Sequence, residues 1–202
     1  MPRVTAITSL TSRPFFVGRY RSAEWGNMVH SAVEKILKGE SHNAEKKIEP
    51  SLLAFEKWRE VHALRIANPA TDVECKAYDF ENGYAGTIDM VAEVQGKRGI
   101  VDLKTSNAMR EEYSLQTAAY LNAYNKGVQK KLQATTRWIL RIDQYEECKG
   151  CFARKKDKDG KERISGGNEW CNHQWSLPTG EAEFLELKGH EEDLKAFLAA
   201  KE

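Results

Sequence analysis

The run Gly86-Thr-Ile-Asp-Met-Val-Ala-Glu-Val94 is followed by the turn Gln95-Gly-Lys-Arg-Gly99 and by Ile100-Val-Asp-Leu-Lys104. Two β-rich runs joined by a short glycine-containing loop predict an antiparallel hairpin. Each run carries one carboxylate among apolar neighbours, Asp89 or Asp102. Residues two apart on a strand share a face, so Asp102 and Lys104 point the same way. Because a buried carboxylate needs an opposite charge or a metal ion, the hairpin predicts a functional site.

The overall composition favours one domain without a strongly charged surface. The chain has 202 residues, enough for a substantial core, and a net charge of +1. We therefore expect residues 1–202 to form a single domain, in which any nucleic-acid contact comes from a local patch. No apolar run approaches the roughly 18–20 residues of a membrane span, and the N-terminus lacks a signal-peptide core. Four unevenly spaced cysteines favour reduced thiols and a cytoplasmic location.

The segments before the hairpin predict two helices and a strand. Apolar residues recur at helical spacing over residues 22–38 and again over residues 50–66. Alternation over residues 71–78 predicts a strand with Glu74 on its polar face. The first 20 residues mix arginines with aromatic side chains, a mixture that suits either a nucleic-acid rim or a packed N-terminal arm. The residues concerned are Arg13, Phe15, Phe16, Arg19, Tyr20 and Arg21.

The segments after the hairpin complete a layered fold. The patterns predict a helix over residues 110–126, a strand over residues 133–146 and a last helix over residues 190–200. A charged, cysteine-containing insertion at about residues 147–173 follows the long strand, and residues 170–177 and 183–187 read as extended. Strands grouped together and covered by helices predict an α/β (α+β) fold with a central mixed β-sheet flanked by helices.

One face of the helix predicted at residues 110–126 is rich in large side chains that can form hydrogen bonds. Its members are Tyr113, Gln116, Tyr120 and Tyr124. A tyrosine face often packs into a core, whereas the amide of Gln116 needs hydrogen-bond partners. The face fits either core packing or contact with bases and phosphates.

A series of motifs lies in order along these elements. They are Gly26-x-x-x-His30, Gly86-x-x-Asp89, Asp102-x-Lys104 and Gln116-x-x-x-Tyr120. The series resembles the RecB/Cas4-like exonuclease branch of the PD-(D/E)XK nuclease superfamily, over about residues 20–140 and more weakly in the last helix. Asp-x-Lys alone is a weak pattern, so the resemblance depends on the ordered series. It implies a restriction-endonuclease-like core and hydrolysis of phosphodiester bonds in DNA.

Phosphodiester hydrolysis explains why acids and a lysine lie together. Mg²⁺ or Mn²⁺ held by oxygen ligands neutralises the phosphate and activates water. Asp89, Asp102 and the main-chain carbonyl of Leu103 are the expected ligands. Lys104 is expected to orient the attacking water or to stabilise the developing negative charge. Glu74 either reaches the site from the adjoining strand or stays an exposed carboxylate.

The resemblance implies roles for three more residues. His30 is a further metal ligand by resemblance, and its imidazole suits Mn²⁺ better than Mg²⁺. Gln116 and Tyr120 border the cleft, where similar nucleases use this pair to position the DNA or the lysine.

The remaining cysteines form two pairs of possible ligands, Cys148-x-x-Cys151 and Cys171-x-His173. Such pairs on either side of a loop suit a tetrahedral Zn²⁺ site. The alternative is that these residues bind no metal at all. Relatives with an iron–sulfur cluster use four cysteines, one of them before the nuclease motifs, so the histidine here makes a cluster a poor match.

The sequence therefore predicts a metal-dependent DNA nuclease, acting from DNA ends, in repair, recombination, phage replication or CRISPR adaptation. The chain has no Gly-x-x-x-x-Gly-Lys-Ser/Thr phosphate loop, so we expect either a stand-alone nuclease or one that works with a separate helicase, recombinase or single-strand-binding protein. The alternatives are a non-catalytic nucleic-acid-binding module on the same fold and a structure-specific endonuclease. Strand preference and oligomeric state stay open.

Overall fold

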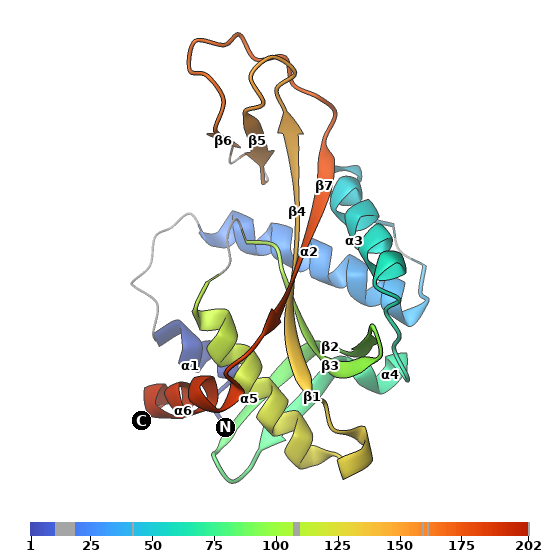
Figure 1. The fold of residues 1–202 in the computed structure, drawn as a ribbon, viewed down its shortest axis with the longest axis vertical. Helices are drawn as coiled ribbons and strands as arrows, with labels where there is room; N and C mark the ends of the chain where they lie inside the picture. Colours follow the sequence, from blue (N-terminus) through green and yellow to red (C-terminus); the bar gives the residue numbers. More distant parts are fainter. Residues whose placement is uncertain (11–18, 42, 107–109, 159, 161, 202) are drawn as a thin grey trace.

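The computed structural model describes residues 1–10, 19–41, 43–106, 110–158, 160 and 162–201. It confirms the predicted fold class, a mixed β-sheet flanked by helices (Figure 1). The helices are α1 (Val4–Leu10), α2 (Arg19–Lys38), α3 (Glu49–Val61), α4 (Pro69–Asp72), α5 (Glu112–Gly127) and α6 (His190–Lys201), with 3-10 turns η1 (Lys46–Ile48) and η2 (Lys130–Leu132). The strands are β1 (Val73–Asp79), β2 (Tyr84–Val94), β3 (Lys97–Lys104), β4 (Thr136–Glu147), β5 (Arg154–Asp157), β6 (Glu162–Ser165) and β7 (Thr179–Leu187).

The sheet is built around the long strand β4. Strands β1, β2 and β3 form an antiparallel meander, which confirms the predicted hairpin. Strand β3 runs parallel to β4, and α5 makes the crossover that a parallel pair requires. Strand β7 covers the other edge of β4 in antiparallel register. The far end of β4 pairs with β5, and β5 pairs with β6, so β4 links the core sheet to an extension at one end (Figure 1).

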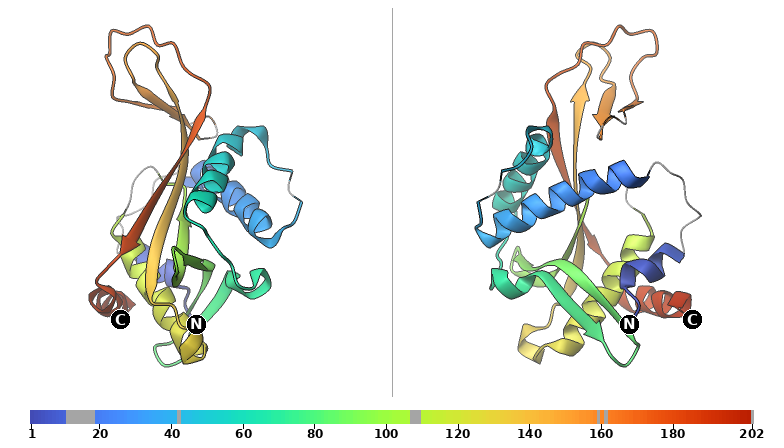
Figure 2. Two further views of the ribbon diagram at one scale, coloured as in Figure 1. Left: turned by 45° about the vertical axis from the view of Figure 1, so that its right-hand side comes forward. Right: turned by 180° about the vertical axis from the view of Figure 1, so that it is seen from behind.

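Two apolar clusters fill the two faces of the sheet. Met90, Val101 and Leu103 belong to the cluster that packs under α2 and α3, whereas Val91 and Ile100 belong to the cluster under α5. Figure 2 (left) shows α2 and α3 on one side of β4 and α1 and α6 on the other. Because alternate residues of a strand face opposite sides, Asp102 and Lys104 share the face of Ile100 and point toward α5.

Some boundaries differ from those that the sequence predicts. The strand predicted at residues 170–177 is wrong: this segment makes one isolated bridge, between Cys148 and Trp175, and otherwise turns around a cluster of cysteines. The extended piece predicted at residues 183–187 is the nine-residue strand β7, which gains its length by pairing along β4. Helix α3 ends at Val61 and not at residue 66, since Ala63 has a φ of 49°.

The N-terminal arm is described only in part. Arg13, Phe15 and Phe16, which suggest a nucleic-acid rim, lie outside the described residues. Helix α2 begins at Arg19, three residues earlier than its pattern predicts, and α1 adds a short helix to the predicted lead-in. Within the described ranges, no helix combines the length and apolar character needed to cross a membrane.

Two adjacent leucines of α3 give a matched test of the core. Leu52 is 6% exposed in the cluster under α3, whereas Leu53 is 63% exposed. We expect Leu52→Ala to lower the free energy of unfolding by about 2–5 kcal/mol, because it leaves a cavity, and Leu53→Ala to change it by less than about 0.5 kcal/mol. Denaturant unfolding of both variants measures the difference. Equal effects would contradict the packing of α3 described above.

Candidate active site

The site begins with a buried ion pair at the end of β3. Asp102 is 2% exposed, and one of its carboxylate oxygens, Oδ2, lies against the ammonium of Lys104. Apart from this ammonium, no described residue donates a hydrogen bond to that oxygen. Because buried carboxylate oxygens are normally satisfied, a buried oxygen with only an ion-pair neighbour leaves room for a further cation.

Asp89 lies beside Asp102 because β2 and β3 are paired. The register that places Met90 opposite Val101 puts the two acids opposite each other where the ladder ends. Asp89 Oδ2 accepts a hydrogen bond of 2.6 Å from the backbone N–H of Leu103, and its Oδ1 lies 3.4 Å from Nδ1 of His30 on α2. The structure thus brings His30, Asp89 and Asp102 together from three elements, as the motif series implies.

Glu74 reaches the same place from β1. The pairs Val73–Met90 and Cys75–Ile88 leave Glu74 opposite Asp89. Its φ of 54° is left-handed, which costs a residue other than glycine about 1–3 kcal/mol and is found disproportionately at functional sites. Glu74 is half-buried, so of its two predicted placements the structure has the one at the site. An open pocket is lined by Gly26, Asn27, His30, Ser31, Glu34, Glu74, Asp89 and Thr105.

Helix α5 holds Lys104 from the other side. Lys104 Nζ donates a 3.1 Å hydrogen bond to Gln116 Oε1, and Gln116 Nε2 donates one of 2.9 Å to the hydroxyl of Tyr120. The ammonium also lies 4.8 Å from the ring centroid of Tyr113, a contact that the sequence analysis did not assign. A Cβ on Gly86 would lie 2.3 Å from the Tyr120 ring, so the glycine of this motif makes room for the tyrosine.

These contacts favour one of the two roles expected for the pair on α5. Gln116 is 8% exposed and Tyr120 is 3% exposed, so little of either side chain faces solvent. Their hydrogen bonds connect them to Lys104 and to each other. The arrangement supports positioning of the lysine more than direct contact with DNA.

The charges of the site are strongly coupled. Burial raises the pKa of Asp102 to about 6, and the nearby charge of Asp89 adds to this effect while Lys104 opposes it. Burial also acts on Asp89, but His30, Lys104 and the N–H of Leu103 outweigh it and lower the pKa of that carboxyl. The pKa of Glu74 is raised by burial and by its acidic neighbours Asp89 and Glu34. Excess negative charge in a partly desolvated site favours a bound cation.

Most of the chain matches one known protein family. The profile of the PD-(D/E)XK nuclease superfamily matches residues 10–198, nearly the whole chain. The chain belongs to the PD-(D/E)XK nuclease superfamily. No curated protein sequence matches it at a significant level. Membership implies a nuclease, a hydrolase that acts on phosphodiester bonds of nucleic acid, and PD-(D/E)XK nucleases usually use divalent metal ions.

The donor set of this PD-(D/E)XK chain fits such an ion in chemistry. Asp89, Asp102, Glu74 and the carbonyl of Leu103 offer oxygen, which hard divalent cations prefer. Two of these acids are paired with protein cations in the structure, Asp102 with Lys104 and Asp89 with His30. An ion here would compete with those ion pairs.

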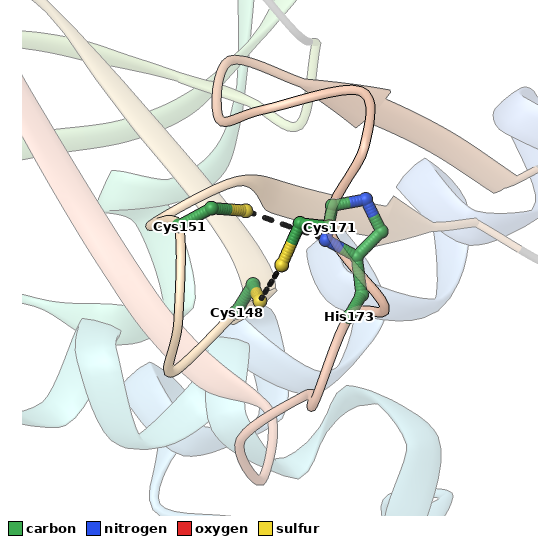
Figure 3. A group of neighbouring side chains, drawn as sticks. All are labelled: Cys148, Cys151, Cys171 and His173. Carbon is green, nitrogen blue, oxygen red and sulfur yellow. Dashed lines mark hydrogen bonds between the residues drawn. The ribbon is translucent and has the colours of Figure 1, made fainter.

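A second cluster of possible ligands lies far along β4. Among the described residues, four side chains that can bind a metal ion form a compact group here: Cys148, Cys151, Cys171 and His173 (Figure 3). The sequence analysis gives these residues as two pairs of possible ligands, and the structure brings the two pairs together. Burial opposes ionisation of Cys148, but N–H groups of Gly150 and Cys151 lower its thiol pKa to about 5.

Sequence reasoning misses Lys158, which touches the edge of the nuclease site from the charged insertion. Its Nζ donates a hydrogen bond to the carbonyl of Thr105, the residue that follows Lys104. A lysine in a charged run has no local feature that distinguishes it from a solvated one, so only the tertiary structure identifies this contact.

Replacement of Asp102 or Asp89 by asparagine should change the free energy of unfolding in opposite directions at neutral pH, when a chelator keeps metal ions away from the protein. The pKa of Asp102 is raised from 3.8 to about 6, so its ionisation destabilises the fold as pH rises through this range. The pKa of Asp89 is lowered from 3.8, so its charge stabilises the fold above that value. We expect Asp102→Asn to raise the free energy of unfolding by about 1–3 kcal/mol and Asp89→Asn to lower it.

Denaturant unfolding as a function of pH measures both changes. The gain in Asp102→Asn should vanish below about pH 4, where the wild-type carboxyl is protonated in both the folded and the unfolded state. A loss of stability in Asp102→Asn at neutral pH would contradict the burial and charge coupling described for this site.

Proposed function

We propose that residues 1–202 act as one metal-dependent DNA nuclease domain that degrades DNA from its ends, in the RecB/Cas4-like branch of the superfamily. The observation that carries the proposal is the buried Asp102 beside Asp89, with an oxygen whose only described donor is the ammonium of Lys104. Buried ion pairs add little stability, so a protein without catalytic activity would gain little from this arrangement. The arrangement therefore supports a catalytic role.

The acids of the site would hold Mg²⁺ or Mn²⁺. Asp89, Asp102 and the carbonyl of Leu103 are the proposed ligands, with Glu74 as an additional acid at the pocket. His30 would be a further ligand, for which Mn²⁺ is better suited than Mg²⁺. When bound, the ion would supply charge neutralisation for the phosphate and an activated water.

Lys104 would act on the reacting atoms directly. Its ammonium would stabilise the negative charge that develops on the phosphate or orient the attacking water. Gln116 and Tyr120 would position the lysine, since they fix one of its hydrogen bonds. Burial against Tyr113 and α5 lowers the freedom of this side chain, which keeps the ammonium in place for the reaction.

The biological setting that we propose follows the same branch of the superfamily. We propose a cytoplasmic protein that acts on single- or double-stranded DNA in repair, recombination, phage replication or CRISPR adaptation. A separate helicase, recombinase or single-strand-binding protein would present the DNA. A binding module without catalysis and a structure-specific endonuclease are the two outcomes that the test below distinguishes from an exonuclease.

Removal of the Lys104 ammonium tests the catalytic assignment. We expect Lys104→Met to reduce cleavage of end-labelled linear DNA by about 100-fold or more, because charge stabilisation in the transition state is lost. DNA binding should change far less than cleavage. Lys97→Met is the matched control, since Lys97 is an exposed lysine at the opposite end of β3 and pairs with Glu186.

The substrates separate the three functions. Linear single- and double-stranded DNA should be degraded with Mg²⁺ or Mn²⁺ and not with a chelator, and covalently closed circles should survive. Cleavage of circles would favour the endonuclease. Binding of DNA without cleavage of any substrate by the wild-type protein would favour the binding module. Full activity in Lys104→Met would contradict the site assignment.

His30 provides a test of the ion itself. We expect His30→Ala to weaken binding of Mn²⁺ more than that of Mg²⁺, because it removes the proposed nitrogen ligand. Titration of each ion, followed by the shift in unfolding temperature, measures the two affinities. Lys35→Ala is the control, since Lys35 is exposed on the same helix and does not line the pocket. Unchanged affinity for both ions in His30→Ala would remove His30 from the ligand set.

A further inference from the structure

Residues 148–178, here called the finger, form a long insertion between β4 and β7 that has almost no apolar core. Among its described residues only Cys148, Ala153 and Lys158 are buried, and all four residues of β6 are exposed. A two-stranded hairpin such as β5–β6 is marginal by itself in water. Small units that lack a core usually depend on a disulfide or a metal ion. The finger therefore needs a source of stability other than burial.

The base of the finger carries four side chains that converge from its two ends. Cys148 and Cys151 follow β4, whereas Cys171 and His173 precede β7 (Figure 3). All four ligand atoms lie within 4.8 Å of one another. The cluster would close the intervening chain, with β5 and β6, into a loop.

Two distances within the cluster match those of a tetrahedral zinc site. With Zn–S near 2.3 Å and Zn–N near 2.0–2.1 Å, two sulfur ligands lie about 3.8 Å apart, and a sulfur and a nitrogen about 3.5 Å apart. The Sγ atoms of Cys148 and Cys171 are 3.8 Å apart, and Cys151 Sγ is 3.4 Å from His173 Nδ1. A disulfide would require a sulfur separation of about 2.05 Å, so the geometry does not describe one.

The backbone around the cluster leaves space for sulfur. A Cβ on Gly167 would lie 2.8 Å from Cys151 Sγ, and the φ of Gly167 is +77°, so both space and backbone require glycine there. A Cβ on Gly150 would lie 3.6 Å from Cys171 Sγ, an ordinary contact. The turn between the first two cysteines is closed by a 2.9 Å hydrogen bond from the N–H of Phe152 to the carbonyl of Cys148.

We propose that Cys148, Cys151, Cys171 and His173 bind one Zn²⁺ as a structural site that holds the finger. Three thiolates and one imidazole fill a tetrahedral shell, which leaves no open position for substrate. Soft sulfur ligands select zinc over Mg²⁺ or Mn²⁺, so this site and the nuclease site would hold different ions. Iron–sulfur clusters are usually held by four cysteines, and the fourth ligand here is a histidine.

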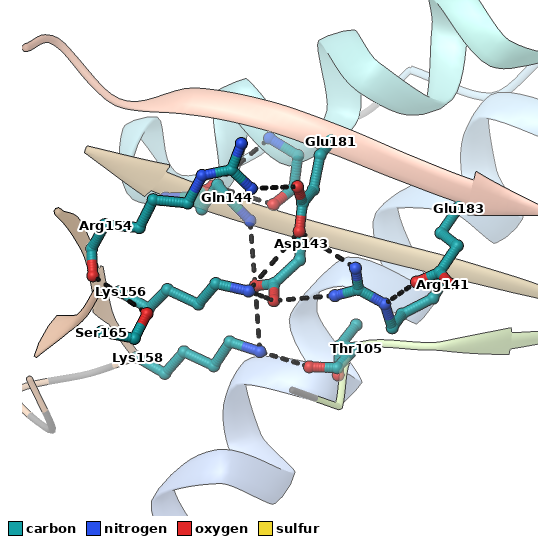
Figure 4. Close-up of polar contacts among 11 residues, drawn as sticks. Thr105, Arg141, Asp143, Gln144, Arg154, Lys156, Lys158, Ser165, Glu181 and Glu183 are labelled. Carbon is teal, nitrogen blue, oxygen red and sulfur yellow. Dashed lines mark hydrogen bonds and ion pairs between the residues drawn. The ribbon is translucent and has the colours of Figure 1, made fainter. Parts of the chain in front are cut away.

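The zinc would also fix a contact between the finger and the nuclease site. Lys156 Nζ lies 2.6 Å and Lys158 Nζ 3.1 Å from the carboxylate of Asp143, which is fully buried on β4 (Figure 4). Lys158 also donates to the carbonyl of Thr105, one residue after Lys104. Both lysines hold the finger against Asp143 of β4, and Lys158 alone reaches the end of β3.

Metal content and protection of the finger test the proposal without any use of nuclease activity. The full chain, purified under reducing conditions and supplied with Zn²⁺, should bind one equivalent in addition to any ion at the acidic site. Co²⁺ in its place should give tetrahedral bands with sulfur charge transfer. Removal of zinc with a chelator should speed tryptic cleavage within residues 154–163 by about 10-fold or more, because the backbone of β5 and β6 then opens to the protease.

Two variants and one control localise the ion. Cys151→Ser should weaken zinc binding by more than about 100-fold and expose the finger to trypsin, whereas Cys75→Ser, on β1, should change neither. His173→Cys should keep zinc and raise the sulfur-to-cobalt absorption by about one third, from three thiolates to four. Failure of the wild type to take up zinc, the absorption of an iron–sulfur cluster, or full zinc retention in Cys151→Ser would overturn the proposal.

Discussion

The buried contact between Asp102 and Lys104 is the interaction on which the rest of the site depends. A carboxylate with 2% exposure is costly to desolvate, and the adjacent ammonium offsets part of that cost. Burial raises the pKa of Asp102 to about 6, and the negative charge of Asp89 beside the pair adds to this effect. Replacement of a buried ion pair by apolar residues is often neutral or stabilising, so the catalytic role that we propose explains the arrangement better than stability does.

The fold explains why this contact can be rigid. Strand β3 pairs with β2 as far as Val101 and with β4 as far as Lys104, so Asp102 follows directly on one ladder and lies within the other. The parallel pairing of β3 and β4 requires a crossover, and α5 supplies it across the face to which Lys104 points. The same helix therefore closes the core and orients the lysine through Gln116. One topological requirement serves both packing and the site.

Local pattern is enough to predict the hairpin, its acids and the ordered motifs, because alternation and turn residues act over a few positions. It leaves two placements for Glu74, at the site or exposed, because the observed one uses a left-handed φ that is unusual for glutamate. Residues 170–177 are rich in aromatic residues, as strands often are, yet the chain turns there around Cys171 and His173. The contact of Lys158 with Thr105 joins residues 53 positions apart, beyond the reach of any local rule.

The central claim is that Asp89 and Asp102 form a divalent metal site. A crystal of the protein soaked in Mn²⁺ and measured at the manganese absorption edge tests it most directly, because the anomalous signal locates the ion independently of activity. The account predicts one peak in contact with Asp89, Asp102 and the carbonyl of Leu103, and no such peak in Asp102→Asn. Manganese bound only elsewhere, or bound at the same place in Asp102→Asn, would contradict it.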